Sequence, residues 1–126
     1  MLKLKIVEDF PAEVEVRLPD GSTGTFTARF RYISKERYAE LIDQAQALAA
    51  DGDTRISDLL NWKARVIDEL LTSVEGIADG DGKPLDQDSA RRAVLEHLPL
   101  LNAAFDAFVS CYGGAAAKNS RTSRSR

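Results

Sequence analysis

ISDLLNWKARVIDELLTSVEGIADGDGKPL, residues 56–85, decides the fold, because a helical pattern fills its first part and glycines fill its second. Apolar residues recur there at the spacing of one helical face: Ile56, Leu59, Leu60, Val66, Ile67, Leu70, Leu71 and Val74. Three glycines and a proline follow between residues 75 and 85, where no helix can continue. We therefore expect an amphipathic helix over residues 56–74, buried along one side and followed by a turn.

Two alternating stretches upstream predict a β-hairpin. Apolar and charged residues alternate over residues 13–18, and aromatic or small residues alternate with threonine and arginine over residues 25–32. Pro19-Asp20-Gly21-Ser22 lies between them and suits a tight turn. Pro11 lacks a backbone donor and is expected to limit strand pairing at its position. A third strand could come from the alternating apolar residues Leu2, Leu4 and Ile6.

One helix is expected before the long one and a short helix after it. Ser34 can cap a helix with an apolar stripe over residues 38–49, and Gly52 can end it as a left-handed cap. After the glycine-rich turn, Asp88 or Ser89 can cap a short helix.

A last helix completes the predicted fold. Pro99 suits its first turn, and Gly113-Gly114 is expected to close it. The resulting order predicts an α+β fold, in which an N-terminal antiparallel hairpin or three-stranded sheet precedes a bundle of about four helices. We expect one domain over residues 1–112 and a disordered basic tail over residues 113–126.

Length and composition fit one soluble domain. The chain has 126 residues, of which 44% are hydrophobic, enough to bury a core without disulfides. It has no run of eighteen apolar residues that could span a membrane, and its first six residues lack the apolar core of a signal peptide. Cys111 is the only cysteine, which fits a reducing cytoplasm.

The net charge of −3 hides an asymmetry. The last fourteen residues carry four positive charges and no acid, which leaves −7 on residues 1–112. The acidic body would repel nucleic acid, and the tail has no interleaved aromatic residues, so it supports weak and non-specific contact at most. A solubilising tail is the other interpretation of this segment.

No group of residues predicts catalysis, a metal or a cofactor, so we expect no enzyme. His97 is the only histidine, which excludes metal sites that need several imidazoles. Cys111 lies on an apolar helix, where a cysteine usually acts as a small hydrophobic residue. The acidic turn from Asp79 to Gly82 is followed by Lys83 and Pro84, where a calcium-binding EF-hand loop needs a ligand and a glycine.

Residues 70–85 resemble a recurrent segment of the tail assembly chaperones of long-tailed bacteriophages, which are encoded just before the tape measure protein. The parts that carry the resemblance are Val74-Glu75-Gly76-Ile77, the Asp-rich turn Asp79–Gly82 and Pro84-Leu85, followed by Ser89, the leucine-rich helix from Ala93 to Leu101, the aromatic helix from Phe105 to Tyr112, and Lys118-Asn119. The chain departs from this pattern at Val74, where the family often has tryptophan, and at Gln87, where an aromatic residue is common.

The resemblance implies a non-enzymatic role in tail assembly. Members of that family keep the long, helical, aggregation-prone tape measure protein soluble in the host bacterial cytoplasm, and they are typically absent from the mature virion. Many are also made as a longer product by ribosomal frameshifting, and the extension recruits the tail tube protein. The tape measure protein is therefore the expected partner, and the tail tube protein is a second one if such an extension exists.

Trp62, Phe105, Phe108 and Tyr112 are the candidate protein-binding residues, in a groove formed by one chain or across a homo-oligomer. The other interpretation of Trp62 is that it packs at the edge of the protein's own core. Two alternative functions remain open from the sequence. One is a small structural adaptor or completion protein of a phage particle, and the other is a cytoplasmic regulator that binds nucleic acid through its basic tail.

Overall fold

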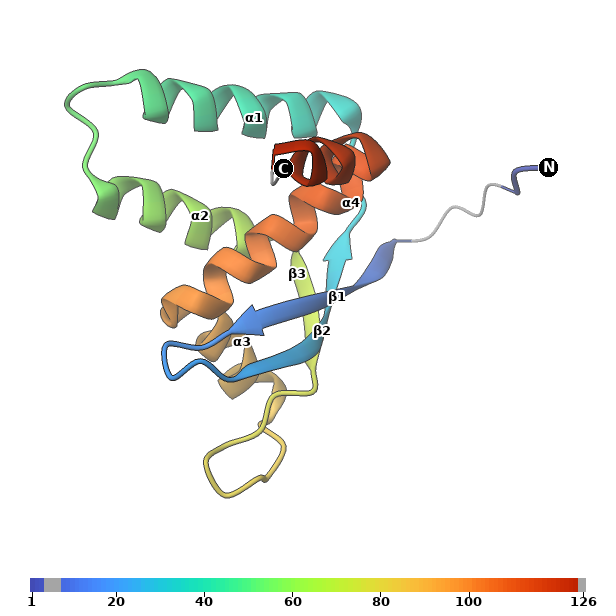
Figure 1. Ribbon diagram of the computed structural model, residues 1–126, viewed down its shortest axis with the longest axis vertical. Coiled ribbons are helices and arrows are strands. Elements are labelled where there is room, and N and C mark those ends of the chain that lie inside the picture. The colour runs from blue at the N-terminus through green and yellow to red at the C-terminus, as the bar shows by residue number, and fades with distance from the viewer. Residues whose placement is uncertain (4–7, 125–126) are drawn as a thin grey trace.

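The computed structural model describes residues 1–3 and 8–124, and for residues 113–124 it describes the backbone alone. The elements in chain order are β1 (Asp9–Arg17), β2 (Thr23–Arg31), α1 (Lys35–Ala50), α2 (Ile56–Leu70), β3 (Leu71–Glu75), α3 (Gln87–Glu96) and α4 (Leu98–Arg124). The strands form one antiparallel sheet in the order β1-β2-β3, and the helices pack together on one side of it (Figure 1). The protein therefore has the predicted α+β fold.

β1 and β2 form the predicted hairpin, with Val14 opposite Phe26. The Leu18 amide donates a hydrogen bond to the Ser22 carbonyl oxygen (2.8 Å), and Gly21 has the positive φ of 90° that this tight turn requires. Apolar side chains of both strands share the buried face, and polar side chains share the other.

The predicted helix over residues 56–74 is wrong at its C-terminal end. α2 stops at Leu70, and Leu71–Glu75 forms the third strand of the sheet, antiparallel to β2. This strand, and not the N-terminal segment, supplies the third member of the sheet. Leu4 and Ile6, which the sequence offered for that place, lie outside the described residues, and Leu2 is exposed.

A β-bulge explains why β3 has the sequence pattern of a helix. The register between β2 and β3 shifts between Arg29 and Phe30, so that Thr72 is the extra residue of β3. Because of this shift, Leu71 and Val74 are both buried although they lie three residues apart. Their spacing matches that of a helical face and continues the stripe of α2 without a break.

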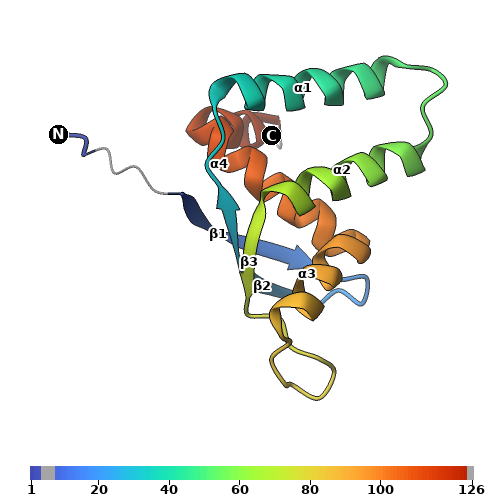
Figure 2. The same cartoon turned by 180° about the vertical axis from the view of Figure 1, so that it is seen from behind.

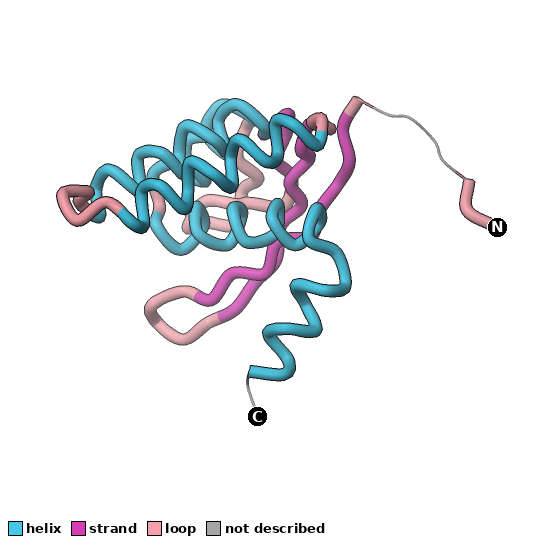
Figure 3. The backbone as a smooth tube through the Cα atoms, turned by 90° about the horizontal axis from the view of Figure 1, so that it is seen from above, coloured by secondary structure: helices cyan, strands magenta, loops and turns pink. Residues whose placement is uncertain are grey.

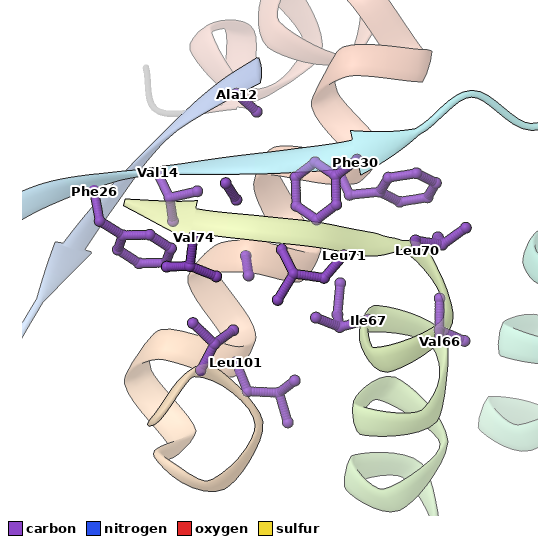
Figure 4. Packing of buried hydrophobic residues seen from close by; sticks show 14 of the residues in the cluster. Ala12, Val14, Phe26, Phe30, Val66, Ile67, Leu70, Leu71, Val74 and Leu101 are labelled. Atoms are coloured by element: carbon purple, nitrogen blue, oxygen red, sulfur yellow. The ribbon is translucent and has the colours of Figure 1, made fainter. Parts of the chain in front are cut away.

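The core lies between the apolar face of the sheet and the helices. Figure 4 shows Val14, Phe30 and Leu71 of the three strands on the side of the sheet that faces Ile67 of α2 and Leu101 of α4. The largest fully buried side chains come from strands and helices alike: Phe30, Phe108, Ile67, Leu70, Leu71, Val14, Val74 and Val94. Each such side chain contributes roughly 1.5–3 kcal/mol when fully buried, so this shared layer holds the helices against the sheet.

Side-chain caps begin α1 and α3. Ser34 accepts a hydrogen bond at Oγ from the Arg37 amide (3.1 Å), as predicted. α3 is capped by Asp86, which accepts from the Ser89 amide (2.7 Å), and the expected cap at Asp88 or Ser89 is wrong. Asp86 has the extended backbone that a cap needs, whereas the other two residues already lie in the first helical turn.

The end of α1 also differs from the prediction, because Gly52 does not have a positive φ. The carboxylate of Asp51 accepts a hydrogen bond from the Asp53 amide (2.9 Å), and its carbonyl oxygen accepts one from the Thr54 amide (3.1 Å). This side-chain turn reverses the chain without a left-handed residue.

α4 has Pro99 in its first turn, as predicted, but it continues to Arg124 and does not end at Gly113-Gly114. Each glycine costs about 1 kcal/mol relative to alanine in a helix, and the three alanines that follow, residues 115–117, are the strongest helix formers. The helix axis bends in its C-terminal part (Figure 3), as helices commonly do at such small-residue pairs. The disorder of residues 113–126 in solution stays a prediction.

Candidate functional site

Trp62 of α2 and Phe105 of α4 pack against each other, with ring centroids 5.5 Å apart. Trp62 is 7% exposed, and its indole N–H donates a hydrogen bond to Oε1 of Gln44 in α1 (2.8 Å). Phe105 is half-buried, and Nζ of Lys63 lies 5.2 Å from its ring centroid in a cation–π contact. Nζ also donates to Oδ1 of Asn102 (3.3 Å), so the lysine stem crosses the apolar face and its charge stays at the edge.

Phe108 and Tyr112 of α4 form a second aromatic pair, with ring centroids 4.9 Å apart. Phe108 is 2% exposed and belongs to the core. Tyr112 stacks on Tyr38 of α1 at 5.3 Å, and its hydroxyl accepts a hydrogen bond from the Ile33 amide (3.0 Å) and donates one to the Arg31 carbonyl oxygen (3.3 Å). Burial of this hydroxyl raises the pKa of Tyr112.

α1 contacts one member of each aromatic pair, Tyr112 through Tyr38 and Trp62 through Gln44. It is itself shallowly packed, because Leu41 is its one buried residue. An ion pair between Arg37 and Glu69 (2.7 Å) joins α1 to α2, but half of the Glu69 side chain is exposed, and such pairs contribute little. Trp62 and Phe108 are thus buried in this conformation and Phe105 and Tyr112 are partly exposed, and α1 contacts Trp62 and Tyr112.

Sequence reasoning missed Phe10, which joins the second aromatic pair from the sheet. Its ring lies 5.7 Å from Tyr112 and 6.1 Å from Phe30. The expectation that Pro11 limits strand pairing hid this residue, but β1 runs through Pro11, which lies opposite Arg29. The signal that could have found it is that Phe10 continues the alternation in phase with the buried residues Ala12, Val14 and Val16.

The glycine-rich turn after β3 uses its own carboxylate internally. Oδ1 of Asp79 accepts hydrogen bonds from the amides of Asp81 (2.9 Å) and Lys83 (3.0 Å). The Asp79 amide donates to the Lys83 carbonyl oxygen (2.8 Å), and Gly82 has a positive φ of 85°. These contacts close a compact loop between Asp79 and Lys83.

Two side chains of α3 close the outer edge of β3. The side-chain amide of Gln87 accepts a hydrogen bond from the Val74 amide (2.9 Å) and donates one to the Val74 carbonyl oxygen (2.7 Å). Arg91 donates to the carbonyl oxygens of Leu71 and Asp68. A neighbouring strand would make the same backbone contacts, so this edge is protected from pairing with another chain.

His97 and Cys111 do not form a catalytic pair. His97 precedes the first residue of α4 and Cys111 lies fourteen residues further along the chain, which separates them by about 20 Å at about 1.5 Å per helical residue. Cys111 is exposed, so it does not pack as the small hydrophobic residue that the sequence predicted, and desolvation raises the pKa of its thiol, which makes it a weaker nucleophile. Among the described residues, no three His, Cys, Asp or Glu side chains gather in a way that could hold a metal ion.

Within the described part of the chain, no helix combines the length and the apolar character needed to cross a membrane. Comparison of the sequence and the structure with protein-family profiles, with curated proteins and with solved structures finds no match.

Proposed function

We propose that this chain is a tail assembly chaperone of a long-tailed bacteriophage. In this role it binds the tape measure protein without chemical change, keeps it soluble in the host bacterial cytoplasm, and is absent from the mature virion. A frameshifted extension of the chain would recruit the tail tube protein. The observation that carries the proposal is the resemblance of residues 70–85, with the helices that follow them, to the recurrent segment of this family.

Two physical properties support a protein-binding role. The charge of −7 on residues 1–112 favours a basic client and disfavours nucleic acid. Two of the four candidate residues, Trp62 and Tyr112, also contact one shallowly packed helix, α1. A client helix that replaced α1 on α2 and α4 would meet Trp62, Phe105 and Tyr112, whose aromatic surfaces suit the apolar face of an amphipathic helix. Phe108 would support this surface from the core below.

Co-expression of the chain with the tape measure protein encoded beside its gene tests the function. We expect the chain to raise the soluble fraction of that client and to co-purify with it. The absence of a tape measure gene from the neighbourhood, or an insoluble client despite folded chaperone, would refute the proposed function. Mass spectrometry of purified particles separates the chaperone from a structural adaptor, because only an adaptor is retained in stoichiometric amounts.

A pair of matched substitutions tests the site separately from the function. Leu41→Ala removes the one buried anchor of α1 and is expected to increase client binding, because α1 contacts Trp62 and Tyr112. Val94→Ala shortens a buried side chain of α3, away from α1, and is expected to leave client binding unchanged. Equal binding by the two variants, with both folded, would show that α1 does not cover the client site.

A further inference from the structure

We propose that the open edge of β1 pairs with the same strand of a second copy of this chain, antiparallel and about a two-fold axis at Val16. This proposal does not depend on the proposed function. β1 is nine residues long and lies at the edge of the sheet opposite β3. Figure 2 shows that the two edges differ, since α3 lies beside β3. Gln87 and Arg91 of α3 close that edge, and no described side chain makes such contacts with the backbone of β1.

Hydrogen bonds near the two ends of the hairpin identify the backbone groups of β1 that face outward. The Tyr32 amide donates to the Glu8 carbonyl oxygen (3.0 Å), and the Leu18 amide donates to the Ser22 carbonyl oxygen (2.8 Å). The register between the strands is continuous, and bonds to one antiparallel neighbour recur at every second residue, so the even-numbered residues of β1 bond to β2. The odd-numbered residues therefore direct their backbone groups to the open edge. Pro11, which has no amide hydrogen, is one of them, as expected for a proline in an edge strand.

The odd-numbered residues also carry charged side chains in a definite order. Glu13 and Glu15 precede Arg17 on the polar face of β1, and all three are exposed. No ion pair between described residues uses any of them. The residues opposite them in β2 are Thr27, Thr25 and Thr23. These three charges are therefore available to a strand that is added at the open edge.

The order of the charges disfavours most two-fold registers. Outward backbone groups must meet outward groups, so each odd-numbered residue lies opposite an odd-numbered residue of the second copy. An axis at Glu13 or at Glu15 sets that glutamate opposite its own copy, and an axis at Val14 sets the two glutamates opposite each other. Axes at residues 11 and 12 set Asp9 opposite one of them, and an axis at Arg17 sets that arginine opposite itself. Each of these registers contains a directly opposed pair of like charges, which is destabilising.

An axis at Val16 leaves no like charges directly opposed. It sets Glu15 opposite Arg17 of the second copy, and the symmetry repeats this pair on the other side of the axis. These residues exchange about four backbone hydrogen bonds across the new edge. On the apolar face, Val16 lies opposite Val16 of the second copy. Leu18, which is 39% exposed in the single chain, lies beside Val14 of the second copy and is covered there.

This pairing extends the sheet without changing its layers. A two-fold axis perpendicular to the sheet keeps the helices of both copies on the same side, and it joins the strands in the order β3-β2-β1-β1-β2-β3. Pro11 lies outside the paired segment, so its missing amide hydrogen costs no hydrogen bond. Because the paired segment is short, we expect a reversible dimer with a Kd on the order of 0.1 mM.

Charge-reversed variants, compared by sedimentation equilibrium, test the register. We expect Glu15→Arg and Arg17→Glu each to dissociate about tenfold or more readily than the wild-type dimer, because each sets like charges opposite one another twice. The double variant Glu15→Arg/Arg17→Glu exchanges the two charges and restores both opposed pairs, so it is expected to dimerise like the wild type. No other two-fold register predicts this recovery, since only an axis at Val16 sets the two residues opposite each other.

A mixture and a pair of controls separate the register from the net charge. In an equimolar mixture of Glu15→Arg and Arg17→Glu, every opposed pair again has opposite charges, so we expect a heterodimer. Glu96→Arg and Arg92→Glu make the same changes of net charge at exposed residues of α3, beside the other edge of the sheet, and are expected to dimerise like the wild type.

Three results would overturn the proposal. These are a wild-type chain that stays monomeric at about 1 mM, single variants that dimerise as well as the α3 controls, and a double variant that stays monomeric although circular dichroism shows it folded. The reversed side chains lie opposite Thr25 and Thr23 within their own chain, so the substitutions are expected to leave the fold unchanged.

Discussion

Gln87→Ala provides the sharpest test of how the sheet ends. In the structure the Gln87 amide makes two hydrogen bonds to the backbone of Val74, a residue only 2% exposed. Each such bond contributes about 0.5–1.5 kcal/mol, so their removal is expected to lower the free energy of unfolding by about 1–3 kcal/mol. The urea midpoint should fall with the slope unchanged, and the Val74 amide should exchange its hydrogen faster.

A second substitution at the same position separates hydrogen bonding from packing. Gln87→Glu retains the acceptor for the Val74 amide, but at neutral pH its carboxylate cannot donate to the Val74 carbonyl oxygen. Protonation of the carboxylate restores that donor, so the difference in the free energy of unfolding between this variant and the wild type should shrink below about pH 4. Gln46→Ala, on the exposed side of α1, is the matched control. If Gln87→Ala were as stable as this control, the amide would not close the edge of β3.

Three further predictions address other contacts. Tyr112→Phe removes the hydroxyl that bonds the backbone after β2, and it should cost about 1–2 kcal/mol in urea unfolding, whereas an unchanged midpoint would contradict that role. The hydrogen bonds from Arg29 and, to a smaller extent, from Thr72 hold the pKa of Asp9 below its usual value. The stability that Asp9 contributes to the folded state is therefore present above its unfolded pKa and is lost as the pH falls through its folded pKa. Asp9→Asn should therefore lose less stability on acidification than wild type, and equal losses would contradict this linkage. Deletion of residues 113–126 should leave the urea midpoint and retention on RNA at low salt unchanged, and sharp, undispersed amide resonances from these residues in the full chain would confirm their predicted disorder.

The sequence predicted the elements whose patterns are local. The hairpin follows from alternation and from a turn that needs glycine at Gly21, and the start of α1 follows from the cap at Ser34. The third strand was hidden because the bulge at Thr72 gives β3 a three-residue spacing of buried positions, which continues the periodicity of α2. Only the long-range pairing with β2 distinguishes a strand over residues 71–75 from a continuation of α2.

The candidate site was predicted by residue type but not by exposure. The sequence identified Trp62 and Phe108 as aromatic residues suited to a partner, and the structure places both in the covered interior. Neither periodicity nor composition states which helix covers a given face, because that depends on how α1 returns over α2 and α4. In the structure, the hydrogen bond from Trp62 to Gln44, which lie eighteen residues apart in the chain, shows that α1 packs beside this part of α2.

Contacts across the sheet edge also bear on the strength of the resemblance. The pattern of the tail assembly chaperones is broken at Val74 and at Gln87, and these two residues are bonded to each other. A glutamine amide reaches the backbone of residue 74 and supplies the hydrogen bonds that close the strand, where an aromatic ring would offer apolar packing instead. The two departures therefore meet at one contact, in which the Gln87 side chain bonds the backbone of residue 74 and would do so whatever side chain that residue carried.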